Sequence, residues 1–542
     1  MSFHCSNQID VILEGNILCH HTEMKNFKSI CEFFIRFRRF VLLFFKKVDI
    51  LNLEVDTMNE TSKGTLIVRI QRASIKNFRN VEYGDIRFPC NYGENIFAPR
   101  ADVLGIYGQN GSGKTTFIDT LEILKVLLSG KKVGAELSDC ISFGQEQAEL
   151  QFEFSILKLN EGNVAYKRRF IYAAILSKDT IDETIKCVTY SNDPEKTSRL
   201  KPIFVCTHQE EDDVFTPQVK LESLFGSKQS AKMNELRVTK LLCKKEHRSF
   251  LFAPEFLKML HEEAQDNDDE VEPLFEMAFY AKTSLFVILN RNNGLISLDA
   301  AIPVNFRTET ASGVFALPID QSKTIPTRFL EIVRQVISTI STVLCKIIPG
   351  AKLTLVELGT ELMEDGNQGT KIQLARELLC ANGELHRLPL KYESEGIKKI
   401  TSILHLLIAA YNNPSITLAV DELDAGIYEY LLGELLRIMQ NSGKGQLIFT
   451  SHNLYPLETL ESNSIVFTTT NHSDRYTRIK SVRATNNLRS MYLREVILGS
   501  DDDAALYEET NVSEIAHAMR IVGKRMESIS LAEDASVEVS NG

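Results

Sequence analysis

The stretch Gly108-Gln109-Asn110-Gly111-Ser112-Gly113-Lys114-Thr115 decides the fold of this chain of 542 residues. It fits the pattern G-x-x-x-x-G-K-[ST], which is typical of loops that bind phosphate groups. Glycines allow the backbone to curl so that successive N–H groups point at one phosphate. A helix expected over residues 116–128 adds its positive N-terminal end. Residues 102–107 are apolar and β-prone, and they predict the strand that leads into the loop.

The residues of this loop have separate expected roles. Lys114 is expected to bridge the β- and γ-phosphates of a nucleotide, and the Thr115 hydroxyl to complete the coordination of Mg²⁺. The other positions hold phosphates through their backbone and through the start of the helix. The predicted nucleotide contacts in this region are Gly108, Asn110, Gly111, Ser112, Gly113, Lys114, Thr115 and Thr116.

A second stretch supplies the acidic groups that hydrolysis requires. Residues 416–420 read Ile-Thr-Leu-Ala-Val and predict a fully buried strand that ends in Asp421 and Glu422. At the carboxyl end of a parallel strand beside the phosphate loop, Asp421 can hold Mg²⁺ through water. Glu422 can orient and deprotonate the attacking water. We therefore predict Asp421 as a metal-binding residue and Glu422 as a catalytic residue.

A third predicted strand, residues 445–450, ends in Ser451 and His452. A histidine after a strand is more often structural than catalytic. Here the order phosphate loop, acidic strand, strand with histidine favours a catalytic interpretation. We predict that His452 reaches the γ-phosphate or the attacking water.

In this order the motifs resemble the ABC-type ATPases of the SMC, RecF and OLD group, which are often labelled AAA-family ATPases in bacterial genomes. The phosphate loop of that group reads G-x-N-G-[SA]-G-K-[ST], as it does here. Upstream, Asn77-Phe78-Arg79 resembles the group's opening-strand element, which lies near the nucleotide. The resemblance covers about residues 66–130 and 385–500.

The resemblance extends to the second half of the chain. Residues 392–399 are similar to a divergent signature motif, S-x-G, with Ser394 and Gly396 at its fixed positions. Residues 423–425 match the D-loop, which includes Asp424, and His452 matches the switch histidine. A glutamine loop has no clear match, and Gln145 and Gln147 are both candidates.

This resemblance implies an α/β fold: a P-loop NTPase of the ABC type, with an ATPase head and a mixed α/β, largely helical insertion. It implies ATP and Mg²⁺ as cofactors. It also implies a homodimer or higher homo-oligomer with ATP at the interface, in which Ser394 and Gly396 of one protomer cap the γ-phosphate held by Lys114 of the other. A hydroxyl at a helix N-terminus makes a good anion receptor.

The predicted domain organisation follows from the positions of the motifs. Residues 58–184 form the ATPase lobe with the phosphate loop, and 385–500 form the lobe with signature, acidic strand, D-loop and switch histidine. Residues 185–384 form an inserted domain for partner recognition or dimerisation, within which residues 329–348 predict a packed helix. The remaining segments are an N-terminal extension, 1–57, and a C-terminal tail, 501–542.

The N-terminal extension leaves two interpretations open. Residues 30–47 could form an amphipathic helix at a membrane interface, although arginines interrupt the stretch. Alternatively translation starts at Met58, since Leu53-Glu54-Val55 can be encoded by a bacterial ribosome-binding sequence. On the second hypothesis, residues 1–57 have no role in function.

Composition narrows the class of protein. A formal net charge of −11 argues against a surface devoted wholly to binding phosphate backbones. The ten cysteines include no C-x-x-C pair, so neither a disulfide framework nor a zinc site is indicated. No uninterrupted apolar run is long enough for a transmembrane helix, and we expect a cytoplasmic protein without a membrane partner.

Two functional hypotheses follow from the resemblance. OLD-type nucleases carry a C-terminal Toprim domain, but here Asp501-Asp502-Asp503 is better interpreted as a helix cap than as a metal site. The first hypothesis is a sensor or scaffold ATPase of a bacterial anti-phage system (PARIS-like, Septu-like or retron-associated) that controls a separately encoded effector, probably a nuclease. The alternative is a RecF-like ATPase that binds DNA in repair, through basic clusters at residues 167–169 and 244–248.

Overall fold

The computed structural model describes most of the chain between residues 64 and 522. The described residues are 64–89, 100–134, 139–160, 163–190, 199–208, 214–227, 230–264, 270–289, 301–307, 312–319, 321–363, 368–379, 384–479, 487–498, 506 and 513–522. The predictions for residues 1–57 and for the cap at 501–503 lie outside them. Among the described residues, no helix is both long and apolar enough to cross a lipid bilayer.

A six-stranded sheet carries the sequence motifs. In spatial order its strands are β18 (Tyr476–Thr477), β17 (Ile465–Thr468), β3 (Asp102–Tyr107), β16 (Gln446–Thr450), β15 (Thr417–Val420) and β8 (Leu285–Ile288). Neighbouring strands are parallel except for β18. The three strands predicted from the motifs are thus confirmed. Because only β16 separates β3 from β15, the segments that follow these two strands emerge at the same edge of the sheet.

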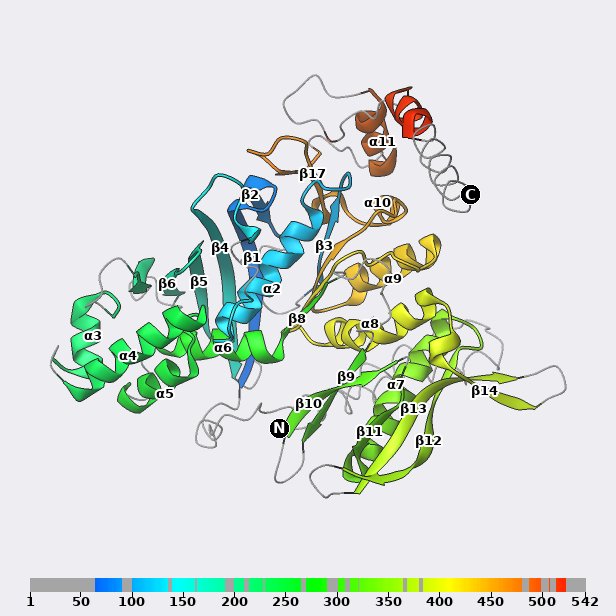
Figure 1. Cartoon of the computed structure of the whole chain (residues 1–542), viewed down its shortest axis with the longest axis horizontal. Helices are drawn as coiled ribbons and strands as arrows, with labels where there is room; N and C mark the ends of the chain where they lie inside the picture. The colour runs from blue at the N-terminus through cyan, green and yellow to red at the C-terminus, as the bar shows by residue number, and fades with distance from the viewer. Residues whose placement is uncertain are drawn as a thin grey trace, which may run out of the picture.

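Alternate residues of these strands enter two hydrophobic cores on opposite faces of the sheet. Leu104 and Ile106 belong to the core that includes α2 (Lys114–Leu128). Val103 and Tyr107 belong to the core that includes α8 (Glu395–Asn412) and α9 (Glu429–Ser442). Figure 1 shows α2 on one side of β3 and the other two helices on the opposite side. Burial on both faces explains why the strands are continuous apolar runs in the sequence.

A second, antiparallel sheet lies beside the first. Its strands, in spatial order, are β2 (Val81–Arg87), β1 (Gly64–Phe78), β4 (Gln147–Asn160), β5 (Asn163–Ser177), β6 (Ile181–Tyr190) and β7 (Lys201–Cys206). The buried amide of Gln446 joins the two sheets. It donates to the Ile70 carbonyl at 2.8 Å and to Asp102 Oδ2 at 2.9 Å, and it accepts from the Ile70 N–H at 3.2 Å.

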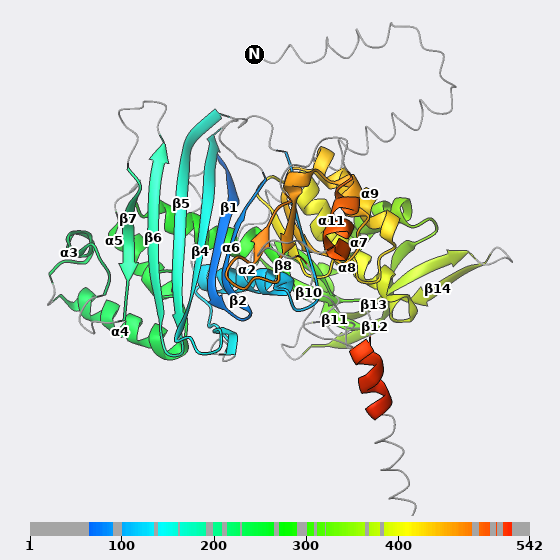
Figure 2. The same ribbon diagram turned by 90° about the horizontal axis from the view of Figure 1, so that it is seen from above.

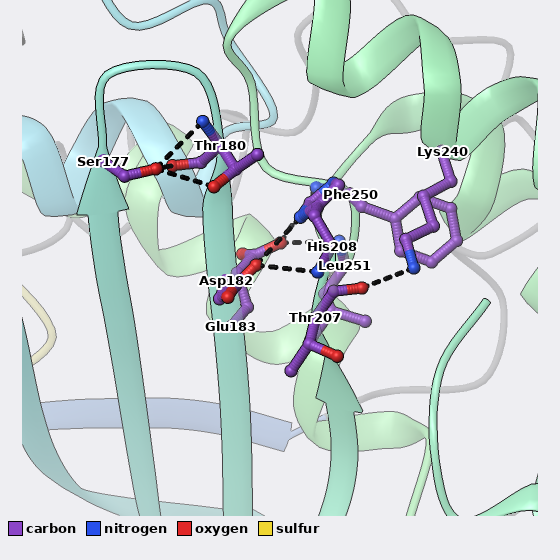
Figure 3. Close-up of polar contacts among 9 residues, drawn as sticks. All are labelled: Ser177, Thr180, Asp182, Glu183, Thr207, His208, Lys240, Phe250 and Leu251. Carbon is purple, nitrogen blue, oxygen red and sulfur yellow. Dashed lines mark hydrogen bonds and ion pairs between the residues drawn. The ribbon is translucent and has the colours of Figure 1, made fainter. Parts of the chain in front are cut away.

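Four helices pack beside this antiparallel sheet (Figure 2): α3 (Gln218–Phe225), α4 (Ala231–Glu246), α5 (Pro254–Glu263) and α6 (Glu272–Thr283). A buried carboxylate, Glu183 of β6, attaches the turn between α4 and α5 to the sheet (Figure 3). It accepts from the Ser249 hydroxyl at 2.6 Å and from the N–H groups of Phe250 at 2.9 Å and Leu251 at 3.2 Å. The Tyr172 hydroxyl adds a fourth hydrogen bond, at 2.7 Å. Burial raises the pKa of Glu183, and these donors oppose that change.

Two smaller sheets and one long helix precede the signature motif. The elements are β9 (Ala301–Arg307), β10 (Ser312–Pro318), β11 (Lys323–Pro326), α7 (Leu330–Ile347), β12 (Lys352–Leu362), β13 (Gln368–Leu379) and β14 (Leu385–Pro389). The helix predicted over residues 329–348 is confirmed as α7. The expected domain boundary at residue 185 falls inside β6, and the chain then returns to the ATPase sheet through β8. The helices α3 to α6, which follow residue 185, pack beside the antiparallel sheet of the first lobe. The two smaller sheets begin only at Ala301.

Short elements complete the described fold. They are the 3-10 helices η4 (Thr327–Phe329), η5 (Leu390–Tyr392) and η6 (Ser462–Ser464), and the helices α10 (Pro456–Thr459) and α11 (Leu488–Leu498). A further helix covers residues 513–522. Figure 2 shows this last helix projecting from the body of the molecule.

Candidate active site

The phosphate loop connects β3 to α2. Gly113 has a φ of 102°, which favours glycine, and a Cβ on Gly108 would lie 1.7 Å from Oγ1 of Thr468. The Ser112 hydroxyl donates to the Gln109 carbonyl at 2.6 Å and also contacts the Thr468 hydroxyl. Thr468, at the end of β17, therefore packs against the curled loop and supports it.

Lys114 lies within the loop and is 6% exposed. Its ammonium group donates to the carbonyls of Gly108 at 2.8 Å and Gln109 at 2.9 Å. Burial lowers the pKa of Lys114 to about 8, although the nearby carboxylates of Asp421 and Glu422 act in the opposite direction. A partly desolvated ammonium group interacts more strongly with an arriving phosphate than one in bulk water does.

Asp421 and Thr115 meet at the edge of the sheet. Oγ1 of Thr115 donates to Asp421 Oδ1 at 3.2 Å and Oδ2 at 3.1 Å. Oγ1 of Thr450 donates to Asp421 Oδ1 at 2.7 Å. A hydroxyl and a carboxylate are hard oxygen ligands of the kind that Mg²⁺ prefers, so these two groups fit the expected metal. Glu422, the predicted base, follows directly and is half-buried.

The Asn77-Phe78-Arg79 element forms a turn at the end of β1, and Asn77 and Arg79 have φ angles of 53° and 52°. The guanidinium of Arg79 forms an ion pair with buried Asp119 of α2. The prediction of Phe78 as a nucleotide contact needs correction, because its side chain is 0% exposed within the hydrophobic core. Phe78 therefore anchors the turn, and its side chain is not available to a ligand.

The structure separates the two candidates for the glutamine loop. The side chain of Asn77 donates to Gln145 Oε1 at 3.3 Å. Gln147 is the first residue of β4 and pairs with Ser177. Gln145 is thus the candidate that contacts the turn beside the phosphate loop.

The predicted signature motif opens α8. Ser394 is the exposed N-cap of this helix, and its hydroxyl accepts from the Ile397 N–H at 3.4 Å. Gly396 packs against the chain that follows the D-loop, since a Cβ at this position would lie 1.9 Å from the Gly426 carbonyl oxygen. The start of α8 and the end of the D-loop therefore form one continuous surface.

The side-chain carboxylate of Asp424 contacts the backbone of His452. Oδ2 of Asp424 accepts from the N–H of His452 at 2.9 Å and from that of Asn453 at 3.0 Å. The side chain of His452 is exposed. These bonds hold the predicted D-loop beside the predicted switch histidine within one protomer.

Several residues that sequence analysis missed also support the site. Asn80 accepts from the Thr116 hydroxyl at 3.0 Å and donates to the Gly111 carbonyl. The buried hydroxyl of Tyr476 donates to the Gly113 carbonyl at 2.9 Å. Asn80 could have been predicted from the sequence, because it directly follows the Asn-Phe-Arg element. Tyr476 carries no local signal, because only the pairing of β17 with β18 brings it to the loop.

The stretch from residue 69 to residue 455 matches a protein-family model described as the AAA ATPase domain. The chain belongs to this family. The match includes the phosphate loop, the two acidic residues and His452, and no curated protein matches the sequence significantly. The predicted α/β fold of a P-loop ATPase is confirmed.

Solved structures similar to this AAA ATPase domain protein include three with low sequence identity. The Smc head domain with a coiled coil and joint from Pyrococcus yayanosii is 12% identical, with coverage of 79% of this chain and 99% of that chain and a TM-score of 0.36. The SMC head domain from Thermotoga maritima is 13% identical, with coverage of 76% of this chain and 99% of that chain and a TM-score of 0.29. The recombination mediator protein RecF with ATP is 13% identical, with coverage of 71% of this chain and 94% of that chain and a TM-score of 0.29.

As an AAA ATPase domain protein, the chain binds ATP and hydrolyses it. Its own residues are suited to this reaction. The loop offers backbone N–H groups and Lys114 to phosphates, while the acidic pair after β15 offers carboxylates to a metal and to water.

Proposed function

We propose that this ATPase acts on the ATP–Mg²⁺ complex, with the γ-phosphate at the sheet edge where Thr115, Asp421 and Glu422 converge. The observation that carries this proposal is the pair of hydrogen bonds from Thr115 to Asp421. When bound there, Mg²⁺ would neutralise charge on the phosphate oxygens.

Each remaining side chain has one role in this proposal. Lys114 neutralises the charge of the β- and γ-phosphates, and Glu422 accepts a proton from the attacking water. His452 contacts the γ-phosphate or the water from the exposed side of the site. Asn77 and Arg79, in the turn at the end of β1, form one wall of the nucleotide pocket.

The nucleotide lies between two copies of the chain in this proposal, with Ser394 and Gly396 of one copy facing the phosphates held by the other. Two features support it. Ser394 and Glu395 at the N-terminus of α8 are exposed, so the Ser394 hydroxyl is accessible to an anion. The flanking side chains of Tyr392, Tyr428 and Tyr430 are 66%, 75% and 55% exposed, as expected of aromatic residues that a second copy covers.

Closure of two copies around ATP gives the protein a nucleotide-dependent shape. We propose that a separately encoded effector, a nuclease, binds only one of these states, and that the pair acts in bacterial anti-phage defence in the cytoplasm. The lobe around α7 and the smaller sheets provides a surface for such a partner. The acidic net charge of −11 favours a protein partner over bulk nucleic acid.

The RecF-like alternative loses support from the charge pairs of the structure. Arg168 is 0% exposed and pairs with Glu272 at 2.7 Å and Glu276 at 3.1 Å. Arg248 pairs with Glu246 and Glu255, each at 2.7 Å. Two clusters that could have bound a phosphate backbone are thus partly neutralised within the chain.

Subunit mixing tests the shared site. Lys114→Ala protein mixed with Ser394→Arg protein forms some dimers in which an intact phosphate loop faces an intact signature, so ATPase activity should reappear. The matched control is Lys114→Ala mixed with Asp421→Asn, because both changes fall in the same half of the site and no intact combination forms. Equal activity in both mixtures would contradict the shared site.

Phage challenge tests the biological role. Cells that carry this gene with its neighbours should lose protection when Lys114→Ala or Glu422→Gln is introduced. The Glu422→Gln protein should retain the product of the neighbouring gene in ATP-dependent copurification. Unchanged protection by both variants would contradict the defence role.

A further inference from the structure

The backbone of Glu422 adopts an uncommon conformation. Its φ angle is 47°, in the left-handed region that non-glycine residues rarely occupy. Such a conformation persists only where neighbouring groups hold it. The direction of the Glu422 side chain depends on this backbone, so whatever holds the backbone also aims the carboxylate.

Thr450 holds the backbone on both sides of Glu422. Its hydroxyl accepts from the Glu422 N–H at 2.7 Å and at the same time donates to Asp421 Oδ1 at 2.7 Å. Its carbonyl accepts from the Leu423 N–H at 2.9 Å. Thr450 is 0% exposed and ends β16, the strand between the phosphate-loop strand and the acidic strand. One side chain therefore sets the geometry of both acidic residues.

Lys399 holds the C-terminal side of Glu422. This residue lies in α8, at the end of the signature-like stretch 392–399, and its ammonium group donates to the Glu422 carbonyl oxygen. Burial lowers the pKa of Lys399, whereas the carboxylates of Asp424, Glu422 and Asp421 oppose this change. The peptide group before Glu422 is thus held by β16, and the one after it is held by β16 through its N–H and by α8 through its carbonyl.

We propose that Thr450 and Lys399 are positioning residues that hold Glu422 in its left-handed conformation and so aim its carboxylate at the attacking water. This inference rests on the proposed role of Glu422 as the general base. Because Lys399 projects from the signature helix, a shift of α8 also moves the carbonyl of Glu422. Arrangement of the base is therefore linked to the position of the signature motif.

The test measures single-turnover hydrolysis and ATP binding for four single variants and their combinations with Glu422→Gln. Thr450→Val and Lys399→Met should each lower the hydrolysis rate by about 10- to 100-fold, the size expected when a catalytic group is displaced. Their dissociation constants for ATP should change by less than about threefold. Thr450→Ser, which keeps the hydroxyl, and Lys399→Arg, which keeps a cationic donor, should recover most of the rate.

Combination with Glu422→Gln distinguishes positioning from general damage. If Thr450 and Lys399 act through the Glu422 carboxylate, their replacement should slow hydrolysis little further once that carboxylate is gone. Full, multiplicative loss in the double variants would overturn the proposal, as would single variants with the wild-type rate. A Glu422→Gln protein that hydrolyses ATP at the wild-type rate would instead defeat the role of the base itself. Thermal unfolding of each variant shows whether it is folded, and Lys399→Met provides the test if Thr450→Val is not.

Discussion

The hydroxyl of Thr115 donates to both carboxylate oxygens of Asp421, at 3.2 and 3.1 Å, although 306 residues separate the two positions. Asp421 directly follows β15, and Thr115 lies at the start of α2, at the end of the phosphate loop that follows β3. Because β16 alone lies between those strands, the two oxygen-bearing groups meet where a metal-bound nucleotide is expected.

Asp421→Asn should raise the Mg²⁺ concentration needed for half-maximal ATPase activity by about tenfold or more, because an amide oxygen carries less charge than a carboxylate. A magnesium titration at saturating ATP measures this change. Glu357→Gln, in the exposed part of β12, is the matched control and should leave the titration unchanged. An unaltered magnesium requirement in Asp421→Asn would remove this residue from the metal site.

The affinity of the free protein for ATP should fall as the pH rises above about 8. Burial lowers the pKa of Lys114 from 10.5 to about 8, so the ammonium form that binds phosphate becomes scarce above that pH. Affinity should decrease by up to about tenfold per pH unit, with uptake of a proton on binding. Calorimetry in buffers of different ionisation enthalpy measures both quantities.

Lys114→Arg is the matched control for this pH effect, because a guanidinium stays charged throughout the range. The ATP affinity of this variant should not change with pH. A wild-type affinity for ATP that does not vary between pH 7 and 10 would contradict the prediction.

The lowered pKa of Lys114 also affects the stability of the protein. Between pH 8 and 10.5 the folded protein holds fewer protons at Lys114 than the unfolded chain, so this group makes the free energy of unfolding rise with pH in that window.

Arg376→Gln should weaken ATP-dependent assembly more than ATP binding by a single protomer. The guanidinium of Arg376, in β13, contacts both carboxylate oxygens of Glu393 at 3.2 Å, directly before Ser394. Loss of this pair releases the signature motif from the smaller sheet. Sedimentation with and without ATP measures the assembly. Arg387→Gln changes an exposed arginine of β14 and should behave as wild type; equal loss in both variants would refute a specific role for Arg376.

Gly396→Ala should destabilise the protein by about 1 to 3 kcal/mol, the range typical of overpacked sites. Its Cβ would lie 1.9 Å from the Gly426 carbonyl oxygen, and two backbone segments cannot separate by a change of rotamer. Thermal denaturation of the ATP-free protein measures the change. Gly134→Ala is the control, since a Cβ there meets no atom within 4 Å. Equal melting temperatures would show that the D-loop moves aside without cost.

Local sequence patterns were sufficient to predict the strands and helices around the motifs. The run at residues 102–107 became β3, and the acidic residues at 421 and 422 follow β15 as expected. These predictions succeeded because strand formation and loop curvature depend on neighbouring residues, and a parallel sheet buried on both faces leaves a continuous apolar run. The boundary at residue 185 could not be predicted in the same way, since β6 and the helices after it pack on strands from earlier in the chain.

What the sequence determined by itself is the chemistry of the chain: a phosphate loop, an acidic pair and a histidine in the order typical of an ATPase. Only the tertiary structure decided which groups hold that chemistry in place. It buried Phe78 and brought Thr450 and Lys399 to the backbone of Glu422. Away from the site, it also paired Arg168 with Glu272 and Glu276. The physical reason is that such contacts join segments distant in sequence. Their geometry is set by sheet order and helix packing, which no local pattern of residues encodes.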